Sequence, residues 1–252
     1  MYIAYSFLIK KLNQTIWKQP MLELVVDMLI FVFDTETDGL PKNMRNVPNV
    51  SNYQEWPAIV QLGYLLYDTD AKKVVLSRNH IIRVPHISEE STRIHGITTA
   101  ISQEEGFPLK WVLNAFLENM KLADIVVAHN MEFDQKVIVA SLYSIMVDEP
   151  GDSYWVNAIG SMMYSNKLYC TMQESIELCK LEAFTKVEKK PYKKFPSLLE
   201  LCRHLFNDEP KGLHNAMNDV IVCFRCFYKM RFGVDVCEEN EEMKLWMNGL
   251  HT

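Results

Sequence analysis

The sequence predicts an α/β fold in which a mixed five-stranded sheet is flanked by helices. Apolar segments rich in β-branched and aromatic residues follow one another early in the chain, at Leu29–Thr35, Ala58–Tyr67 and Lys73–Val84, and such segments predict strands. From Ser88 onward, helical spacing of apolar residues alternates with short strand-like runs. Three strands in succession, followed by alternating helices and strands, are typical of a mixed sheet with helices on its faces.

Each further element has a local signal. The first strand stops where Asp38, Gly39 and Pro41 favour a turn. Apolar residues at spacings of three and four predict the helices. The expected elements after the third strand are helices at Ser88–His95 and Pro108–Lys121, a strand at Ile125–Ala128, a helix to about Met146, a polar turn at Asp148–Asp152, a fifth strand, and two helices of which the last runs to about Phe232.

Two carboxylates lie at the end of the first strand. Side chains alternate between the faces of a strand, so Asp34 and Glu36 should project to the same side. Carboxylates held close together repel each other unless a proton or a cation lies between them, and Mg²⁺ and Mn²⁺ favour such oxygen ligands. Acidic residues are also common where a strand leads into a turn. The pair alone therefore leaves both interpretations open.

Two later segments carry acidic residues near helix starts. Asp134 lies in the first turns of the helix after the fourth strand, and Asp219 lies in the first turn of the last helix, five residues after His214. The helix dipole also favours carboxylates at these positions, and His129 and Asn130 have an alternative role in capping the turn. If His214 directly precedes the last helix, its ring can serve as a base beside Asp219.

Four carboxylates and one histidine are therefore available in three short segments. This set is suited to hydrolysing a phosphodiester with two divalent metal ions, since carboxylate oxygens hold the ions and a histidine accepts a proton. Its members are Asp34, Glu36, Asp134, Asp219 and His214.

The order and separation of these segments resemble the DEDDh family of 3′→5′ exonucleases. That family includes the proofreading epsilon subunit of bacterial DNA polymerase III and the mammalian three-prime repair exonucleases. The matching patterns are Asp34-x-Glu36, Ile94-His95-Gly96-Ile97-Thr98, His129-Asn130-x-x-Phe133-Asp134 and His214-x-x-x-x-Asp219.

The resemblance extends from about Leu29 to Gly233 and implies a ribonuclease-H-like exonuclease fold. Lys167–Met172 is similar to the fifth strand of the family, and Pro196–Cys202 to its helix before the last motif. A related group has a tyrosine four residues before the last aspartate. Asn215 stands there in this chain, which implies the histidine-type variant.

The resemblance also implies the roles of the residues. Asp34, Glu36 and Asp219 would ligate metal directly, Asp134 would hold the second metal directly or through water, and His214 would be the general base. The expected cofactors are two Mg²⁺ ions, with Mn²⁺ as a substitute, and the expected products are nucleoside 5′-monophosphates. The residues expected to contact the terminal nucleotide are Thr35, Thr37, His95, Ile97, His129, Asn130 and Phe133.

The chain divides into three expected parts: an N-terminal extension over residues 1–27, the exonuclease domain over 28–233 and a C-terminal tail over 234–252. Met28 directly precedes the first strand and is an alternative start of translation. The apolar run Met1–Ile9 is too short to span a bilayer, and its lysines follow it instead of preceding it, which is the wrong order for a secretory signal. We expect a cytoplasmic or nucleoid-associated protein without a membrane partner.

The charge and the cysteines limit the remaining possibilities. The net charge of −6 argues against a protein that coats long nucleic acid through its whole surface, but not against a nuclease that grips one end. The six cysteines are expected as reduced thiols. One local basic stretch contacts phosphates and bases or forms a solvated loop; it contains Lys186, Lys189, Lys190, Lys193 and Lys194 with Tyr192 and Phe195 interleaved.

The substrate expectation rests on the family alone. Single-stranded DNA 3′ ends are favoured, with a polymerase or a replication or repair protein as a further partner. An RNA-directed exoribonuclease and a phosphohydrolase of free nucleotides are alternatives. A different class is a module that binds nucleic acid or a polymerase without catalysis, although all five motif residues are present.

Overall fold

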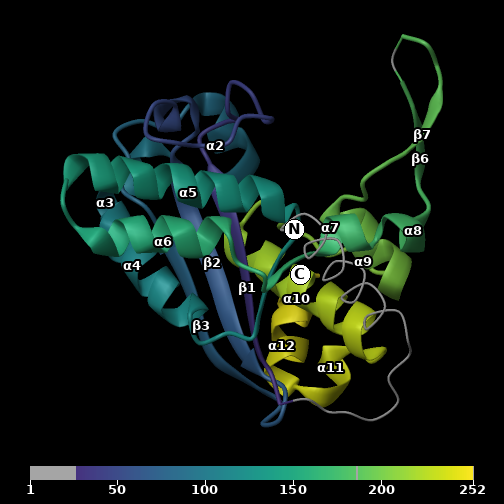
Figure 1. The fold of residues 1–252 in the computed structure, drawn as a ribbon. Helices are drawn as coiled ribbons and strands as arrows, with labels where there is room; N and C mark the ends of the chain where they lie inside the picture. Colours follow the sequence, from purple (N-terminus) through teal and green to yellow (C-terminus); the bar gives the residue numbers. More distant parts are fainter. Residues whose placement is uncertain (1–26, 186, 252) are drawn as a thin grey trace, which may run out of the picture.

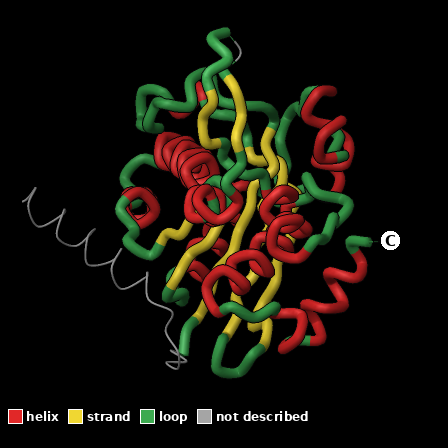
Figure 2. The backbone as a smooth tube through the Cα atoms, turned by 90° about the vertical axis from the view of Figure 1, so that its right-hand side faces the viewer, coloured by secondary structure: helices red, strands yellow, loops and turns green. Residues whose placement is uncertain are grey.

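A five-stranded mixed sheet with helices on both faces forms the body of the molecule (Figures 1 and 2). The computed structural model describes residues 27–185 and 187–251. The strand order is β3-β2-β1-β4-β5. Strands β1 to β3 pair antiparallel, whereas β4 runs parallel to β1 and β5 parallel to β4. The sheet is therefore mixed and five-stranded, as the sequence predicts. The strands are β1 (Leu29–Thr37), β2 (Ile59–Asp68), β3 (Lys73–Ile81), β4 (Ile125–Ala128) and β5 (Leu168–Cys170).

One face of the sheet packs against α4, α5 and α6 (Figure 1). Phe31 and Phe33 of β1 point to this face, and both meet the ring of Phe116 edge-on, with ring centroids 5.3 and 5.2 Å apart. Such edge-to-face pairs stabilise a core beyond the apolar area that they bury. The three helices are α4 (Leu109–Met120), α5 (Met131–Asp148) and α6 (Ser153–Met163).

The opposite face packs against the C-terminal helices. Ile30 and Val32 of β1 point to this face and share a core with α10. We expected residues 234–252 as a tail, but the described part, residues 234–251, contains two helices that bury Val236 and Met243 in the same core. The helices of this face are α9 (Leu198–Phe206), α10 (Ala216–Phe232), α11 (Val236–Glu239) and α12 (Glu241–Gly249).

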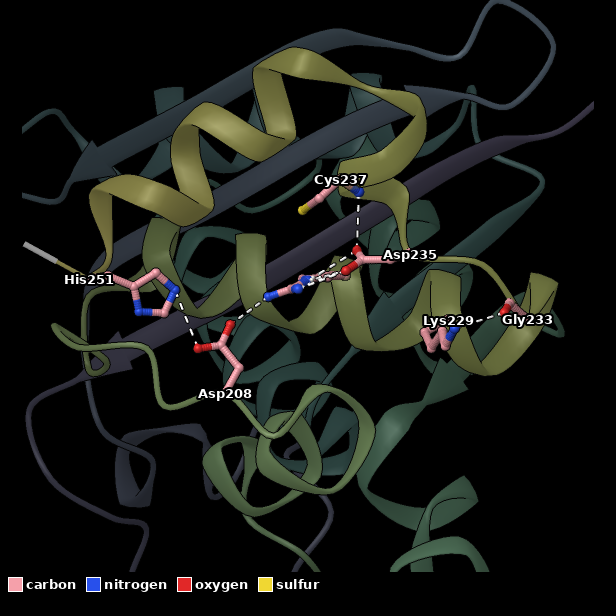
Figure 3. A network of polar contacts seen from close by, with 7 residues as sticks. Asp208, Lys229, Gly233, Asp235, Cys237 and His251 are labelled. Carbon is pink, nitrogen blue, oxygen red and sulfur yellow. Dashed lines mark hydrogen bonds and ion pairs between the residues drawn. The ribbon is translucent and has the colours of Figure 1, made fainter.

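A polar network ties the C-terminal helices to α10 (Figure 3). Arg225 of α10 donates from Nη2 to Asp235 at 2.7 Å and from Nη1 to Asp208 at 2.7 Å. Asp208 also lies 3.3 Å from Nε2 of His251. The Arg225 side chain is only 13% exposed, so this charge is compensated by two carboxylates and not by water.

The remaining elements are short, and α2 is the one among them that the sequence predicted, as a helix at Ser88–His95. Helix α3 follows the cap formed when the Thr98 side chain accepts the Ile101 N–H, and its seven residues are too few to give a periodic pattern. Helix α6 was also not predicted, although its buried residues follow helical spacing. These short elements are η1 (Tyr53–Glu55), α2 (Glu89–His95), α3 (Thr99–Glu105), α7 (Thr171–Glu174), α8 (Ile176–Cys179), β6 (Glu182–Phe184) and β7 (Pro191–Lys193).

Three expectations need correction or comment. Strand β3 ends at Ile81 and not at Val84. Ile82 still donates to Val60 O of β2 at 2.9 Å, but it also bridges to Phe107, and the Arg83 N–H donates to Phe107 O instead of to β2. The basic stretch is only partly a loop: Lys193 lies in β7, which pairs with β6 as an antiparallel hairpin, whereas Lys189 and Lys190 lie in the connection between these strands. The expected extension at residues 1–27 lies almost entirely outside the described residues, as does Lys186.

The six cysteines are free thiols, as expected. Among the described residues, none of the helices combines the length and the apolar character that crossing a membrane requires.

Candidate active site

The alternation of side chains along β1 sets the geometry of the site. Ile30 and Val32 point to the α10 face, so Asp34 and Glu36 continue on that face at the end of the strand. Thr35 points the other way, toward α5. The end of β1 therefore offers two carboxylates to α10 and a hydroxyl group to α5.

Helix α5 brings Asp134 to this strand end. Asn130 ends the connection from β4 in the left-handed region, with φ 69°, and is the N-cap of α5. One turn later, Oδ1 of Asp134 accepts hydrogen bonds from Thr35 N at 3.1 Å and Thr35 Oγ1 at 2.7 Å. Asp134 is only 2% exposed. Its position relative to β1 is thus determined by backbone and side-chain contacts that join residues 99 apart.

The start of α10 brings His214 and Asp219 to the other side of the strand end. His214 adopts φ 69°, a conformation that costs energy for a residue with a Cβ atom. Its backbone N–H donates to Asp219 Oδ2 at 2.9 Å. Asn215 follows as the N-cap, and its side chain accepts from the backbone N–H groups of Met217 and Asn218. The histidine and the aspartate therefore form one local unit at the helix start.

Two residues of β2 seat this helix start on the sheet. The backbone N–H of Ala216 donates to Gln61 Oε1 at 3.0 Å. Gly63 pairs with Asp34 in the sheet, and a Cβ atom there would lie 2.7 Å from the backbone carbon of Ala216. Only glycine permits this approach. Because α10 lies so close to β2, Asp219 comes near the carboxylates of β1.

The four carboxylates act on one another. Burial, the charge of Asp219 and the charge of Asp134 raise the pKa of Glu36 to about 8. Burial raises the pKa of Asp134 to about 7 against the hydrogen bonds from Thr35. Burial likewise raises the pKa of Asp219 to about 7. The pKa of Asp34 is raised well above its ordinary value by burial and then by the charges of the other three.

The histidine lies beside this cluster and is exposed. One ligand atom each from Glu36, His214 and Asp219 lie within 4.8 Å of one another. The structure thus brings together the five residues that the sequence predicts as catalytic, with His214 at the open side. Side chains of this kind at this separation are able to hold a metal ion.

The residues predicted around the terminal nucleotide differ in how accessible they are. Thr37 uses its hydroxyl group to donate to Gly39 O at 2.8 Å. His95 is 9% exposed, and its Nδ1 accepts from Ile97 N at 3.1 Å. Ile97 packs in the core. Asp38 accepts from the backbone N–H and hydroxyl group of Ser88, which anchors α2 to the end of β1.

His129 and Phe133 also make internal contacts. Both ring nitrogens of His129 are engaged, Nδ1 with Thr171 Oγ1 at 2.9 Å and Nε2 with Pro196 O at 3.1 Å. Burial lowers the pKa of His129 to about 4, so the ring is neutral. Phe133 packs against the core. The pocket roles of these residues remain predictions.

The exonuclease family model named RNase_T matches residues 31–227. The chain belongs to this exonuclease family. The match covers all three segments that carry the carboxylates and His214. A search of curated proteins found no significant match.

Solved structures of exonuclease I share the fold of this family member. One matches with a TM-score of 0.55 and 15% identity, over 81% of this chain and 41% of its own. The enzyme from Methylocaldum szegediense matches with a TM-score of 0.52 and 14% identity, over 86% and 44%. The E. coli enzyme in complex with a dT13 oligonucleotide gives 0.54 and 14%, over 86% and 45%.

These likenesses confirm the predicted exonuclease fold, and at such identities they show the fold alone. The chain spans less than half the length of the exonuclease I chains it matches.

Sequence reasoning missed the two residues that seat α10. Gln61 and Gly63 are a polar residue and a glycine within the otherwise apolar run of β2. A glycine inside a strand often marks the close approach of another backbone, and a buried amide needs hydrogen-bond partners. The polar residue and the glycine that interrupt the apolar run were the sequence signal that another element packs closely on β2.

Proposed function

We propose that this family member is a metal-dependent 3′→5′ exonuclease that releases nucleoside 5′-monophosphates from single-stranded nucleic acid, preferably DNA. One observation carries the proposal. Four carboxylates from three distant segments converge at the end of β1, and His214 lies at their open side. Acidic residues that only make a surface polar have no reason to lie together. Hydrolysis of a phosphodiester with metal ions does require such a convergence of ligands.

The residues fit two divalent cations, with Mg²⁺ as the expected ion and Mn²⁺ as a substitute. All four ligands offer carboxylate oxygens, which such hard cations prefer. The raised pKa values of Glu36, Asp134 and Asp219 reflect negative charges that are buried without compensation, and bound cations would compensate them. When bound, such ions stabilise the attacking and leaving oxygens of the scissile phosphate.

The chain's own groups then have distinct tasks. Asp34, Glu36 and Asp219 would hold the metal directly, and Thr35 orients Asp134 toward the same centre through two hydrogen bonds. His214 accepts the proton of the attacking water, a step for which its exposed position beside Glu36 and Asp219 is suited. The hydrogen bond from its backbone to Asp219 keeps the base and the ligand in register.

The substrate preference rests on a solved structure with the same fold and on the family. An exonuclease I with the same fold binds a dT13 oligonucleotide, which favours single-stranded DNA for this chain as well. A polymerase or a replication or repair protein remains a proposed partner on family grounds. RNA is the alternative substrate.

Matched DNA and RNA oligonucleotides, single-stranded or duplex and labelled at either terminus, test the proposal. With Mg²⁺ or Mn²⁺, a 5′ label should give a ladder of shortening products and a 3′ label should give a mononucleotide at once. Excess EDTA should stop both reactions. A ladder from the 3′ label would reverse the polarity. Absence of any product would favour a nucleic-acid-binding module without catalysis.

A further inference from the structure

The hairpin formed by β6 and β7 extends away from the body of the molecule (Figures 1 and 2). We call its described residues, 181–185 and 187–195, the arm. Several of its apolar side chains are exposed to solvent: Val187 by 91%, Phe184 by 61%, Phe195 by 52% and Tyr192 by 49%. Single exposed apolar residues are ordinary, but this number on one short ribbon marks an interaction surface.

Packing against the core does not stabilise the two strands of the arm. Its two strands pair over three residues each, with Ala183 opposite Tyr192 and Glu182 opposite Lys193. A two-stranded ribbon of this length is marginal in water by itself. The exposed aromatic rings contribute little to the fold, so a role in binding explains them better than a role in stability.

The charge of the arm is opposite to that of the chain. The described residues of the arm carry four lysines and two glutamates, a balance of +2, whereas the whole chain has −6. Lys190 pairs with Glu188 and Lys193 with Glu177. All four side chains of these pairs are more than 60% exposed, and exposed pairs contribute little stability. These lysines can therefore leave their glutamates and bind phosphates with little loss of folding stability.

The base of the arm lies next to the candidate active site. Pro196, directly after the arm, has its carbonyl oxygen 3.1 Å from Nε2 of His129. His129 directly precedes Asn130, the N-cap of the helix that carries Asp134. At the same base, Lys194 N donates to Leu181 O at 2.9 Å, which closes the hairpin. A polymer bound along the arm would therefore reach the connection from β4 to α5, the helix that carries Asp134.

We propose that the arm binds the single strand of nucleic acid on the 5′ side of the terminal nucleotide. Lys190 and Lys193 contact phosphates, and Tyr192 stacks on a base. Stacking on an aromatic ring tolerates any base sequence, and lysines on a ribbon follow a backbone without reading it. The inference rests on the proposed exonuclease function. It adds a binding surface that a long strand can reach and a short one cannot, so the arm should favour long substrates.

The test compares a long and a short substrate. The full chain with Lys190→Ala, Tyr192→Ala and Lys193→Ala is assayed on a single-stranded 20-mer and on a dinucleotide, both of DNA and of RNA. Loss of kcat/KM on the 20-mer by about tenfold or more is expected from the lost stacking and charge, with the dinucleotide unchanged. The slope of log kcat/KM against log salt should fall by about 1.4, from about 0.7 for each lysine on a single strand.

A matched variant removes two lysines and one exposed apolar residue elsewhere: Lys121→Ala, Lys244→Ala and Leu245→Ala, on α4 and α12. It should behave as the unmodified chain on both substrates. Equal loss on the 20-mer and the dinucleotide, or no loss on either, would overturn the arm's role. If the unmodified chain degrades neither substrate, the proposed function itself fails.

Discussion

The candidate active site and the arm are both charged, but the molecule holds them in opposite ways. The carboxylates of the site lie at the ends of core elements, and Asp134 is almost completely buried. Lys190 and Lys193 of the arm lie on an exposed ribbon and pair with exposed glutamates. Packing of the core elements therefore fixes the relative positions of the carboxylates in the site. The exposed side chains of the arm are not fixed in this way, and their charge and aromatic character matter more than their exact positions.

The difference follows from what each region has to do. Metal ligands must be held close to one another in spite of their repulsion, which requires backbone elements that cannot move apart. Gly63 and Gln61 supply this constraint where α10 meets β2. Contact with a flexible strand needs only charge and aromatic surface within reach. Single substitutions should accordingly reduce activity strongly in the site and only weakly in the arm.

The largest effect is expected for Asp34→Asn. The substitution keeps the shape of the side chain and removes a charged ligand, so hydrolysis should fall by roughly 10³-fold or more, because metal ions contribute several kcal/mol to such reactions. The melting temperature without metal should not fall, since one of the repelling charges is gone. Activity close to that of the unmodified chain would exclude Asp34 as a ligand; Asp70→Asn, on the exposed turn between β2 and β3, is the control.

His214→Ala comes next. Loss of the general base should lower turnover by roughly 10²–10⁴-fold while the circular dichroism spectrum stays unchanged, because the side chain is exposed. His204→Ala, at an exposed position of α9, should have no such effect. Turnover of His214→Ala near the original rate would mean that another group accepts the proton.

Gln61→Ala should have an intermediate effect without any contact to substrate. It leaves the Ala216 N–H buried without its acceptor, which costs about 1–3 kcal/mol, and it loosens the start of α10. We expect turnover to fall about 10–100-fold, as for other groups that orient ligands, with KM changing less. Asn79→Ala removes the partner of Nε2 of Gln61 but keeps the bond to Ala216, so it should affect turnover less. Equal effects of the two variants would contradict the positioning role.

The smallest effect is on thermal stability, and it depends on pH. The carboxyl groups of Glu36, Asp134 and Asp219 have raised pKa values of about 8, 7 and 7 in the folded chain, against about 4 in unfolded chains. They stabilise the fold while protonated, and this contribution is lost as pH rises from about 4 through 8. In EDTA, the melting temperature should be lower at pH 8.5 than at pH 6.5.

Addition of Mg²⁺ should raise the melting temperature more at pH 8.5 than at pH 6.5, because cations bind the ionised carboxylates. Differential scanning calorimetry of the unmodified chain and of Asp34→Asn measures both effects. A Mg²⁺-induced shift that is the same at both pH values would indicate that the ions bind elsewhere.

The sequence alone determined the features that depend on local periodicity. The alternation along β1 placed Asp34 and Glu36 on one side, and Asp134 and Asp219 were expected in the first turns of their helices. The long helix ends at Phe232 as expected, with Gly233 in the left-handed region that a C-cap favours. The order of the motifs identified the family before any contact was known.

Only the tertiary structure decided which distant groups meet. The hydrogen bond from Ala216 to Gln61 joins residues 155 apart, and His129 reaches the carbonyl group of Pro196 across 67 residues. No periodicity encodes such pairs, since they depend on how closely one element packs on another. The same is true of α11 and α12, which become part of a core only because the α10 face of the sheet is there to receive them.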